Sequence, residues 1–394
     1  MSVEEKLKVL KGTALKNIEK KFGENSYYLG DKKIPSVPLI CSSGSLSLDN
    51  ALCIGGFPEG RIIEIGGQES SGKSTLTLIN IVEIQKAGKL CAYIDVEQSF
   101  DPTYFQKLGG DPSILTVIQP DTMEEAFDVL FELISSGVIS YIVVDSTNAM
   151  IPRKILEGDP TTALMAESAR IMSLQLPKVV SLSSANKCTV VFLSQIRDKI
   201  GIVYGSNEKI GVGNALKFAA SIRIKTSKSD IEKDDGDQGQ SSVTINMNVF
   251  KNKVGVPFKK ASFTLLTGLD GKYGIDNIKE IIEYAVKYEI VKKAGAWFTF
   301  ESERFQGMAN IRKYFDENPS QLNRIKSIVM EKLQKEREEL QTIAASTNFE
   351  SELDKAIEEN SEGKTRKRRT KETVEEAPVV LDESKISEGE VVEE

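Results

Sequence analysis

The chain has 394 residues, of which 40% are hydrophobic and 28% are charged, and its formal net charge is −7. This composition is ordinary for a globular protein, and the length suggests two or three domains. The absence of histidine excludes Ser-His-Asp catalysis, Cys-His catalysis and histidine-built metal sites. No apolar run approaches the ~18 residues of a membrane helix, and the first residues lack the apolar stretch of a secretory signal. We therefore expect neither a membrane span nor export.

The cysteines and the charge balance narrow the class further. The thiols of Cys41, Cys53, Cys91 and Cys188 are scattered without a CxxC pair, which predicts buried thiols in a reducing cytoplasm. The acidic balance lacks the bulk basic footprint of most nucleic-acid binders. Any contact with DNA must therefore come from local loops, or from a surface that is repeated along an assembly.

In chain order, the first predicted element is a helical N-terminal arm over residues 1–34, where leucines recur at helical spacing between lysines. The serine- and glycine-rich stretch Ser36–Gly56 is predicted to be loop and turn. Residues 35–271 then alternate short apolar strands with amphipathic helices. This pattern predicts an α/β core with a mainly parallel sheet and helices on both faces. The expected strands are Ile62–Gly66, Cys91–Val96, Leu115–Ile118, Tyr141–Asp145 and Thr189–Ser194, and the clearest helices are Leu76–Ala87 and Ala126–Ile134, the latter with a capping-box spacing from Asp121 to Glu124.

The second half of the sequence changes pattern. Three strands follow one another without helices and predict an antiparallel extension of the sheet: Ser221–Thr226, Val243–Phe250 and Ala261–Leu266, with a solvated hairpin loop over Ser227–Ser242. Residues 272–335 predict a small α+β C-terminal domain with a short aromatic segment, Ala296–Phe300. Residues 336–394 predict a charged helix and a disordered tail that is first basic and then acidic.

The strongest motif is a glycine-rich loop between the first core strand and its helix. Gly67–Ser74 fits G-x-x-x-x-G-K-[ST], and it has the strand before it and the helix after it that this motif requires. Its backbone N–H groups would converge on phosphate oxygens, Lys73 would reach the β- and γ-phosphates, and the Ser74 hydroxyl would ligate Mg²⁺. The predicted nucleotide-binding residues here are Gly67, Gln68, Glu69, Ser70, Ser71, Gly72, Lys73, Ser74 and Thr75.

Polar residues at the ends of three other strands add candidates for the chemistry. Asp145 ends an apolar strand and fits the carboxylate that holds Mg²⁺. Glu97 follows another strand, where a carboxylate can orient and deprotonate the attacking water; Asp95 would support the metal or simply cap the strand. Gln195 ends a further strand, where its amide could sense the γ-phosphate, although spacing alone favours a polar residue leaving a sheet.

Two loops carry cations among glycines. One lies in 151–178 and the other in 197–217. Such loops suit a phosphodiester backbone, although charge runs are more often solvated loops.

Taken in order, the motifs resemble those of the bacterial RecA recombinases from about residue 5 to residue 335. The residues that carry the resemblance are Gly66–Ser74, Ile94–Pro102, Gln119–Thr122, Ile142–Ser146, Gln195–Gly201, Gly213–Phe218, Lys251–Lys253 and Lys293–Trp297. The resemblance implies a DNA-dependent ATPase that uses ATP and Mg²⁺. It forms a helical homo-oligomeric filament on single-stranded DNA and exchanges strands with a homologous duplex, in recombination, DNA repair and the SOS response to DNA damage. Single-strand-binding and mediator proteins are possible partners, and the location is a bacterial or host cytoplasm.

The same resemblance implies roles for individual residues. Glu97 is similar to the catalytic carboxylate and Gln195 to the γ-phosphate sensor. Asp101 and Tyr104 match positions that contact adenine. Lys251 and Lys253 match lysines that complete the neighbouring subunit's active site, as an arginine finger does. Phe218 matches a residue that relays the nucleotide state between subunits. Two DNA-binding loops are expected at about 157–170 and 197–213, with the residues Met165, Arg170, Arg197, Lys199, Ile200, Gly211, Gly213 and Asn214; Met165 and Ile200 would wedge between bases.

Several positions depart from the family pattern, among them Lys209-Ile210, which replaces a threonine run, and the tail is longer. Gln98 stands where histidine is usual, Val212 replaces a glycine and Ser194 replaces asparagine. A phage-encoded or divergent bacterial member would fit these changes. Two alternatives remain beside the recombinase: a RecA-fold motor such as a hexameric helicase, and a structural filament protein that coats DNA without catalysis.

Overall fold

The structure is a computed structural model, and it describes residues 2–23, 37–158, 164–198, 208–210, 214–233, 240–268 and 271–345. The chain forms two compact units, Met1–Arg337 and Glu338–Glu394. The second unit is described only over the final turns of helix α12 (Pro319–Ala345). No described helix is long and apolar enough to cross a membrane.

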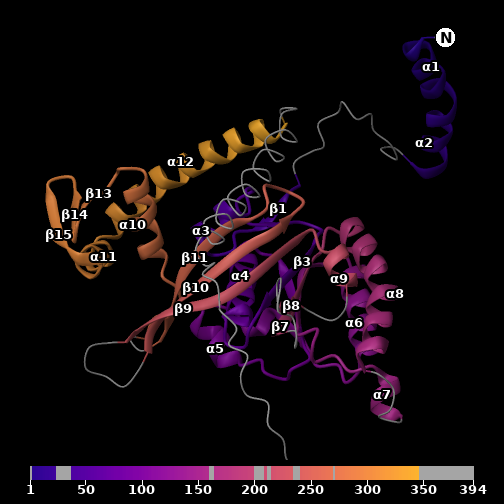
Figure 1. The fold of residues 1–394 in the computed structure, drawn as a ribbon, viewed down its shortest axis with the longest axis horizontal. Coiled ribbons are helices and arrows are strands. Elements are labelled where there is room, and N and C mark those ends of the chain that lie inside the picture. Colours follow the sequence, from indigo (N-terminus) through magenta and orange to yellow (C-terminus); the bar gives the residue numbers. More distant parts are fainter. Residues whose placement is uncertain are drawn as a thin grey trace, which may run out of the picture. The chain divides into compact units, whose positions relative to one another are not determined.

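A large sheet forms the centre of the first unit (Figure 1), in the order β12-β11-β10-β9-β3-β7-β6-β4-β5 with β8 paired to β7. The strands from β9 to β5 are parallel, and the rest of the sheet is antiparallel. The parallel strands are nearly continuous apolar runs, which is expected where helices cover both faces. The bounds are β3 (Ile62–Gly67), β4 (Leu90–Asp95), β5 (Leu115–Ile118), β6 (Ile139–Asp145), β7 (Thr189–Asp198), β8 (Glu208–Ile210), β9 (Ile222–Lys233), β10 (Gln240–Asn252), β11 (Lys259–Thr267) and β12 (Tyr273–Ile275).

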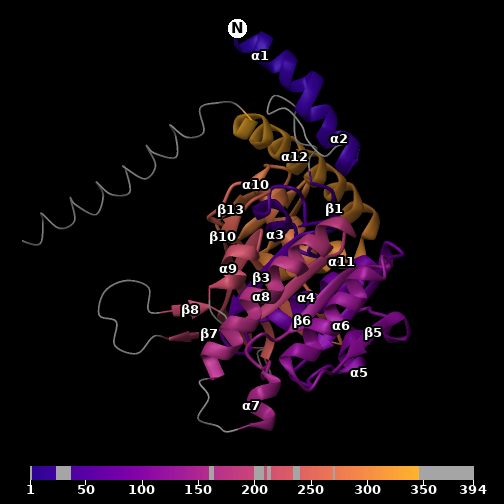
Figure 2. The same ribbon diagram turned by 90° about the vertical axis from the view of Figure 1, so that its right-hand side faces the viewer.

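Two apolar cores lie on the two faces of this sheet. Successive residues of β4, β6 and β7 alternate between the two cores, as the side-chain period of two requires, whereas β9, β10 and β11 contribute apolar residues to one core only. Helices α4 and α3 belong to one core, and helices α6, α8 and α9 to the other (Figure 2). The predicted mainly parallel α/β core with an antiparallel extension is therefore confirmed. The helix bounds are α3 (Leu46–Ala51), α4 (Lys73–Lys86), α5 (Pro102–Lys107), α6 (Met123–Ser135), α7 (Arg153–Glu157), α8 (Leu164–Ala185) and α9 (Ala215–Ala219).

The prediction of loop and turn over Ser36–Gly56 was wrong in part. The stretch contains strand β1 (Leu39–Cys41), which pairs with β2 (Phe57–Pro58), and helix α3. Ser45 caps this helix by accepting a hydrogen bond from the N–H of Leu48 at 3.2 Å. The helix is too short for its leucines to repeat at helical spacing. Its formation therefore depends on burial against the sheet rather than on a local sequence pattern.

Two other local predictions also differ from the structure. The cap of helix α6 is Thr122, one residue after the predicted cap Asp121: Thr122 accepts from the N–H of Glu125. Glu124 instead accepts from the backbone N–H of Arg153 at 2.8 Å. The hairpin loop over Ser227–Ser242 is much shorter than predicted, because β9 and β10 continue into it and only 234–239 lie outside the described residues. Backbone pairing continues there although the side chains are polar.

The N-terminal helix and the C-terminal elements complete the described chain. Residues 3–22 are helical, as α1 (Val3–Leu10), a π-helical segment (Lys11–Leu15) and α2 (Lys16–Phe22). The C-terminal elements have an apolar core of their own. They are α10 (Asn277–Lys287), β13 (Lys292–Ala294), β14 (Trp297–Phe300), β15 (Glu303–Gln306), α11 (Gly307–Glu317) and α12.

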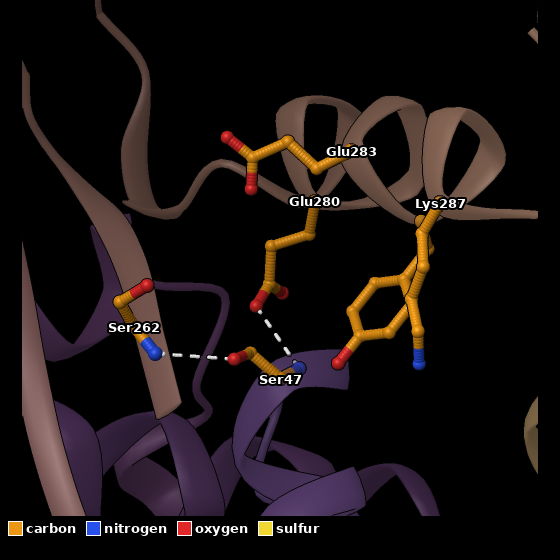
Figure 3. A pocket seen from close by; sticks show the side chains of 6 residues that line it. Ser47, Ser262, Glu280, Glu283 and Lys287 are labelled. Atoms are coloured by element: carbon orange, nitrogen blue, oxygen red, sulfur yellow. Dashed lines mark hydrogen bonds between the residues drawn. The ribbon is translucent and has the colours of Figure 1, made fainter. Parts of the chain in front are cut away.

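One carboxylate of α10 reaches the N-terminus of α3 (Figure 3). Glu280 is 2% exposed and accepts hydrogen bonds from Ser45 Oγ at 2.6 Å, Leu46 N at 3.0 Å and Ser47 N at 3.2 Å. A pocket of about 220 Å³ lies beside this contact. Helix α10 is therefore joined to α3 by a buried acid at the N-terminus of α3, where unpaired N–H groups favour a negative charge.

Candidate active site

The glycine-rich loop joins the end of β3 to the start of α4. A Cβ at Gly67 would lie 2.1 Å from Thr226 Oγ1 and 2.3 Å from Ser71 Oγ, so only glycine fits there. Gly72 has a φ of +78° immediately before α4, a conformation that glycine adopts without strain. Ser71 fixes the loop from inside, because its hydroxyl donates to Gln68 O at 2.7 Å. The result is a preformed turn at a helix N-terminus, which favours anions.

Lys73, the first residue of α4, lies within this turn. Its ammonium group donates to the carbonyls of Gly67 at 3.2 Å and Gln68 at 2.7 Å, and the residue is 8% exposed. Burial lowers the pKa of Lys73, while the nearby carboxylates of Asp145 and Glu97 raise it. The lysine is therefore held close to the loop backbone, with acids on its other side.

Asp145 ends β6 beside the first turn of α4, and it meets the predicted partner there. The Ser74 hydroxyl donates to Asp145 Oδ2 at 2.7 Å, and the Tyr93 hydroxyl donates to the same oxygen at 2.6 Å. Burial raises the pKa of Asp145, whereas these two hydrogen bonds lower it. A hydroxyl and a carboxylate are hard oxygen donors that suit Mg²⁺. Among the described residues no group of three or more histidine, cysteine, aspartate or glutamate side chains is placed to hold a metal ion.

Glu97 and Gln195 come together although 98 residues separate them in the sequence. Gln195 Nε2 donates to Glu97 Oε1 at 3.2 Å, and Ser146 Oγ donates to the same carboxylate oxygen. The backbone N–H of Gln195 in turn donates to Asn148 Oδ1 at 2.7 Å. An acid that follows β4 and an amide within β7 thus face each other.

Asp95, for which a metal role and a capping role were both open, makes capping contacts. Its carboxylate accepts from Ser99 N at 3.0 Å, Phe100 N at 3.1 Å and Gln119 Nε2 at 3.0 Å. These bonds hold the turn that follows β4, and so they hold Glu97 in place.

Of the two residues expected near adenine, Tyr104 lies beside the first turn of α4. Tyr104 places its hydroxyl 3.2 Å from Thr75 Oγ1. Its ring packs edge to face with Tyr273 of β12, with the ring centroids 6.1 Å apart. Asp101 caps α5 by accepting from Thr103 N at 2.8 Å. This arrangement gives a flat aromatic side chain at the edge of the glycine-rich loop.

The lysines expected to act on a neighbouring subunit lie around the end of α9. Lys251 Nζ donates to the carbonyls of Lys217 at 2.7 Å and Phe218 at 3.3 Å. Burial lowers the pKa of Lys251, and the nearby cations Lys253 and Arg223 lower it further. Lys253 is exposed, and Phe218 is 69% exposed. In a single chain the structure does not bring these residues into hydrogen-bond contact with the glycine-rich loop.

The predicted DNA-binding residues fall only partly within the described chain. Met165 is 62% exposed near the start of α8, and the exposed Arg170 forms an ion pair with Glu167 at 2.7 Å. Asn214 is exposed just before α9. Arg197 lies in β7 opposite Lys209 of β8, so this part of the second loop is a strand pair that the sequence did not predict. Lys199, Ile200, Gly211, Gly213 and residues 159–163 lie outside the described residues.

Sequence reasoning missed several residues of this site. Tyr93 and Ser146, which hold Asp145 and Glu97, had only weak signals: a hydroxyl within an apolar strand and a serine after a strand-ending acid. The buried ion pair of Glu64 with Arg223 was also missed. A lone charge in an apolar strand is the available signal, since it requires a partner.

Comparison with known proteins finds matches along most of the chain. The model of the RecA N-terminal domain matches residues 8–271, and that of the RecA C-terminal domain matches residues 279–334. The chain is 43% identical over 322 residues to Protein RecA of Acinetobacter baylyi strain ATCC 33305 / BD413 / ADP1, covering 81% of this chain and 90% of the relative. It is 43% identical over 341 residues to Protein RecA of Rickettsia bellii strain RML369-C, covering 86% of this chain and 95% of the relative.

Proposed function

This chain belongs to the RecA family, and from that premise we propose that it is a DNA-dependent ATPase that forms a helical filament on single-stranded DNA. In the filament it pairs the bound strand with a homologous duplex and exchanges strands, in recombination and DNA repair. The observation that carries the proposal is the shared carboxylate oxygen of Glu97, which accepts from both Ser146 and Gln195 beside the glycine-rich loop.

We assign the binding of ATP to the loop Gly67–Ser74 and to Thr75. The loop backbone and Lys73 neutralise the phosphates, and Asp101 and Tyr104 border the base. Ser74 and Asp145 are the residues that would hold Mg²⁺, which when bound neutralises charge on the phosphate oxygens. The hydroxyl of Tyr93 keeps the Asp145 carboxylate oriented toward Ser74.

Glu97 is the proposed general base. A carboxylate at this strand end orients the attacking water and accepts its proton. Two features of Gln195 suit a sensor. Its side chain donates a hydrogen bond to Glu97, the proposed general base, and its backbone belongs to β7, which leads toward residues 197–213. A change in the Gln195 side chain on nucleotide binding would therefore be transmitted along β7 to the second proposed DNA-binding loop.

Lys251 and Lys253 are proposed to complete the active site of the adjacent subunit. The hydrogen bonds of Lys251 to the carbonyls of Lys217 and Phe218, together with the exposure of Lys253 and Phe218, support a role at a subunit interface. Lysines there would neutralise charge that develops on the transferred phosphoryl group. Assembly would then be a condition for turnover.

DNA binding is assigned to the loops 157–170 and 197–213 of each subunit, repeated along the filament axis. The proposed residues are Met165, Arg170, Arg197, Lys199, Ile200, Gly211, Gly213 and Asn214. A repeated basic surface accounts for DNA binding by a chain with a net charge of −7. The accompanying domain division is an N-terminal oligomerisation arm at 1–34, the ATPase core at 35–271, a C-terminal domain at 272–335 and a charged tail at 336–394.

The experiment that tests this function measures ATP turnover with and without single-stranded DNA, together with strand exchange between a circular single strand and a homologous linear duplex. Stimulated turnover with exchange supports the proposal. Stimulated turnover without exchange, with rings rather than filaments in electron micrographs, would favour a helicase-like motor. Filaments without turnover would favour a non-catalytic DNA-coating protein.

A further inference from the structure

A buried ion pair lies at the centre of the sheet, away from the nucleotide contacts. Glu64 of β3 and Arg223 of β9 are register partners on adjacent parallel strands, and Arg223 Nε donates to Glu64 Oε2. Glu64 is 2% exposed and Arg223 is 7% exposed. Both strands otherwise bury apolar side chains, and α9 packs against β3 (Figure 2).

Stability alone does not explain charges at these two positions. Two apolar residues of similar volume would fold at least as well, because the desolvation of a buried pair offsets its attraction. Burial also raises the pKa of Glu64, against the effect of Arg223 and of a hydrogen bond from Ser194. A pair that costs desolvation energy is better explained by what it holds in place.

The contacts of Glu64 connect the ion pair to the residues beside Glu97 and Gln195. Ser194 Oγ donates to Glu64 Oε1 at 3.2 Å, and the hydroxyls of Ser194 and Thr147 lie 3.1 Å apart. Ser194 directly precedes Gln195 in β7, and Thr147 directly follows Ser146. Gln195 and Ser146, which contact Glu97, are therefore each the sequence neighbour of a residue in this buried hydrogen-bond network.

The contacts of Arg223 connect the ion pair to Lys251, the lysine proposed to act at the subunit interface. The Arg223 guanidinium lies over the Phe250 ring, 4.7 Å from its centroid. Phe250 is the irregular position in the β9–β10 pairing, where the register shifts between Val249 and Lys251. Lys251 is the register partner of Arg223. The ring and the guanidinium thus fix the bulge from which Lys251 reaches the end of α9.

We propose that Glu64 and Arg223 are positioning residues that hold Gln195 and Lys251 in one fixed relative placement. They couple the nucleotide-facing amide to the lysine that serves the next subunit. This inference rests on the proposed function. It makes the ion pair a requirement for coupling rather than for folding or for nucleotide binding.

The test compares the native chain with the double variant Glu64→Met/Arg223→Met, which removes both charges and keeps the volume. The affinity for a fluorescent single-stranded oligonucleotide is measured with and without a non-hydrolysable ATP analogue. The ratio of the two affinities is the coupling, and we expect it to be at least about tenfold in the native chain and close to one in the variant. The affinity for the analogue itself should change by less than about twofold, which a general loss of structure would not allow.

Two further variants keep the test decisive. Asp276→Asn/Arg312→Met removes another ion pair, 3.0 Å long and between α10 and α11, and should keep the native coupling. Ser194→Ala removes only the hydrogen bond to Glu64 and should give an intermediate ratio. This variant keeps the inference testable even if the double variant does not fold. Native coupling in both the double variant and Ser194→Ala would overturn the inference. A ratio near one in the native chain would instead contradict the proposed function, and the inference with it.

Discussion

Gln195 Nε2 lies 3.2 Å from Glu97 Oε1, so an amide of β7 hydrogen-bonds the carboxylate that follows β4. Ser146 donates to the same oxygen. The acid therefore has two neutral donors on one side, and its other oxygen has no contact of this kind with either residue. Such a carboxylate is oriented without being neutralised, as a general base requires.

Replacing Glu97 tests this role. We expect Glu97→Gln to lower DNA-stimulated turnover by about 10²–10⁴-fold, because the amide cannot accept a proton from water. ATP and DNA binding should remain, since Glu97 does not belong to the glycine-rich loop. Single-turnover hydrolysis and equilibrium binding of a fluorescent ATP analogue measure the two effects. Turnover at the native rate would remove Glu97 from the catalytic machinery.

The glycine-rich loop makes a separate prediction. Lys73→Ala should weaken ATP binding by about tenfold or more, the loss expected for a hydrogen bond to a charged group. The matched control is Lys86→Ala at the other end of α4, which loses only an exposed ion pair with Glu83. Isothermal titration with ATP compares the two variants. Equal affinities for ATP in both would show that Lys73 does not reach the phosphates.

The cross-subunit role of Lys251 can be tested by mixing variants. Lys251→Ala keeps its own loop intact, and Lys73→Ala keeps its own Lys251 intact. Lys251→Ala should be nearly inactive alone, by analogy with the loss of an arginine finger, which costs about 10³–10⁵-fold. Lys73→Ala alone should turn over little ATP at limiting ATP concentration, because it binds ATP weakly. In a random equal mixture about a quarter of the interfaces pair an intact loop with an intact lysine, and turnover should recover to about that fraction. A mixture that is no more active than its parts would place Lys251 in its own subunit's site.

The buried carboxylate of Glu280 makes a prediction about pH. Burial raises its pKa to about 7, and it also raises the pKa of the nearby Asp49 to about 6. Because the folded pKa of Glu280 exceeds its unfolded value, the folded chain holds this proton more tightly than the unfolded chain does. Its contribution to stability is therefore complete below about pH 4.5 and is lost as the pH rises through about 7, with a magnitude of roughly 3 kcal/mol.

The variant Glu280→Gln mimics the protonated acid, and its free energy of unfolding should depend less on pH between about 4.5 and 7.5 than that of the native chain. Urea unfolding at several pH values measures the difference. Glu289→Gln, which changes an exposed carboxylate just after α10, should follow the native pH profile. Identical slopes for the native chain and Glu280→Gln would rule out a titration of Glu280 in this range.

The elements with strong local patterns were predictable from the sequence. The strand Leu115–Ile118 has the predicted bounds, and the loop Gly67–Ser74 lies between its predicted strand and helix. Cysteines 41, 53, 91 and 188 are buried and free, as their scattered positions without a CxxC pair indicated. These features depend on residues close together in the sequence, where spacing carries the information.

The parts that could not be predicted depend on distant partners. Helix α3 was missed because its stability comes from burial of Leu48 against the sheet rather than from a helical period. The cap of α6 was misplaced because Glu124 is used by the backbone of Arg153. The contact of Tyr93 with Asp145 joins two strands whose pairing the sequence suggests but whose register it does not.

The central claim is that ATP hydrolysis by this chain is coupled to single-stranded DNA within a filament. The most direct test measures steady-state ATP turnover of the native protein over a range of single-stranded DNA concentrations, with Glu97→Gln as the baseline. We predict a rise of at least about tenfold that saturates with DNA and is absent from the Glu97→Gln variant. Turnover by the native protein that is the same with and without single-stranded DNA would contradict the account.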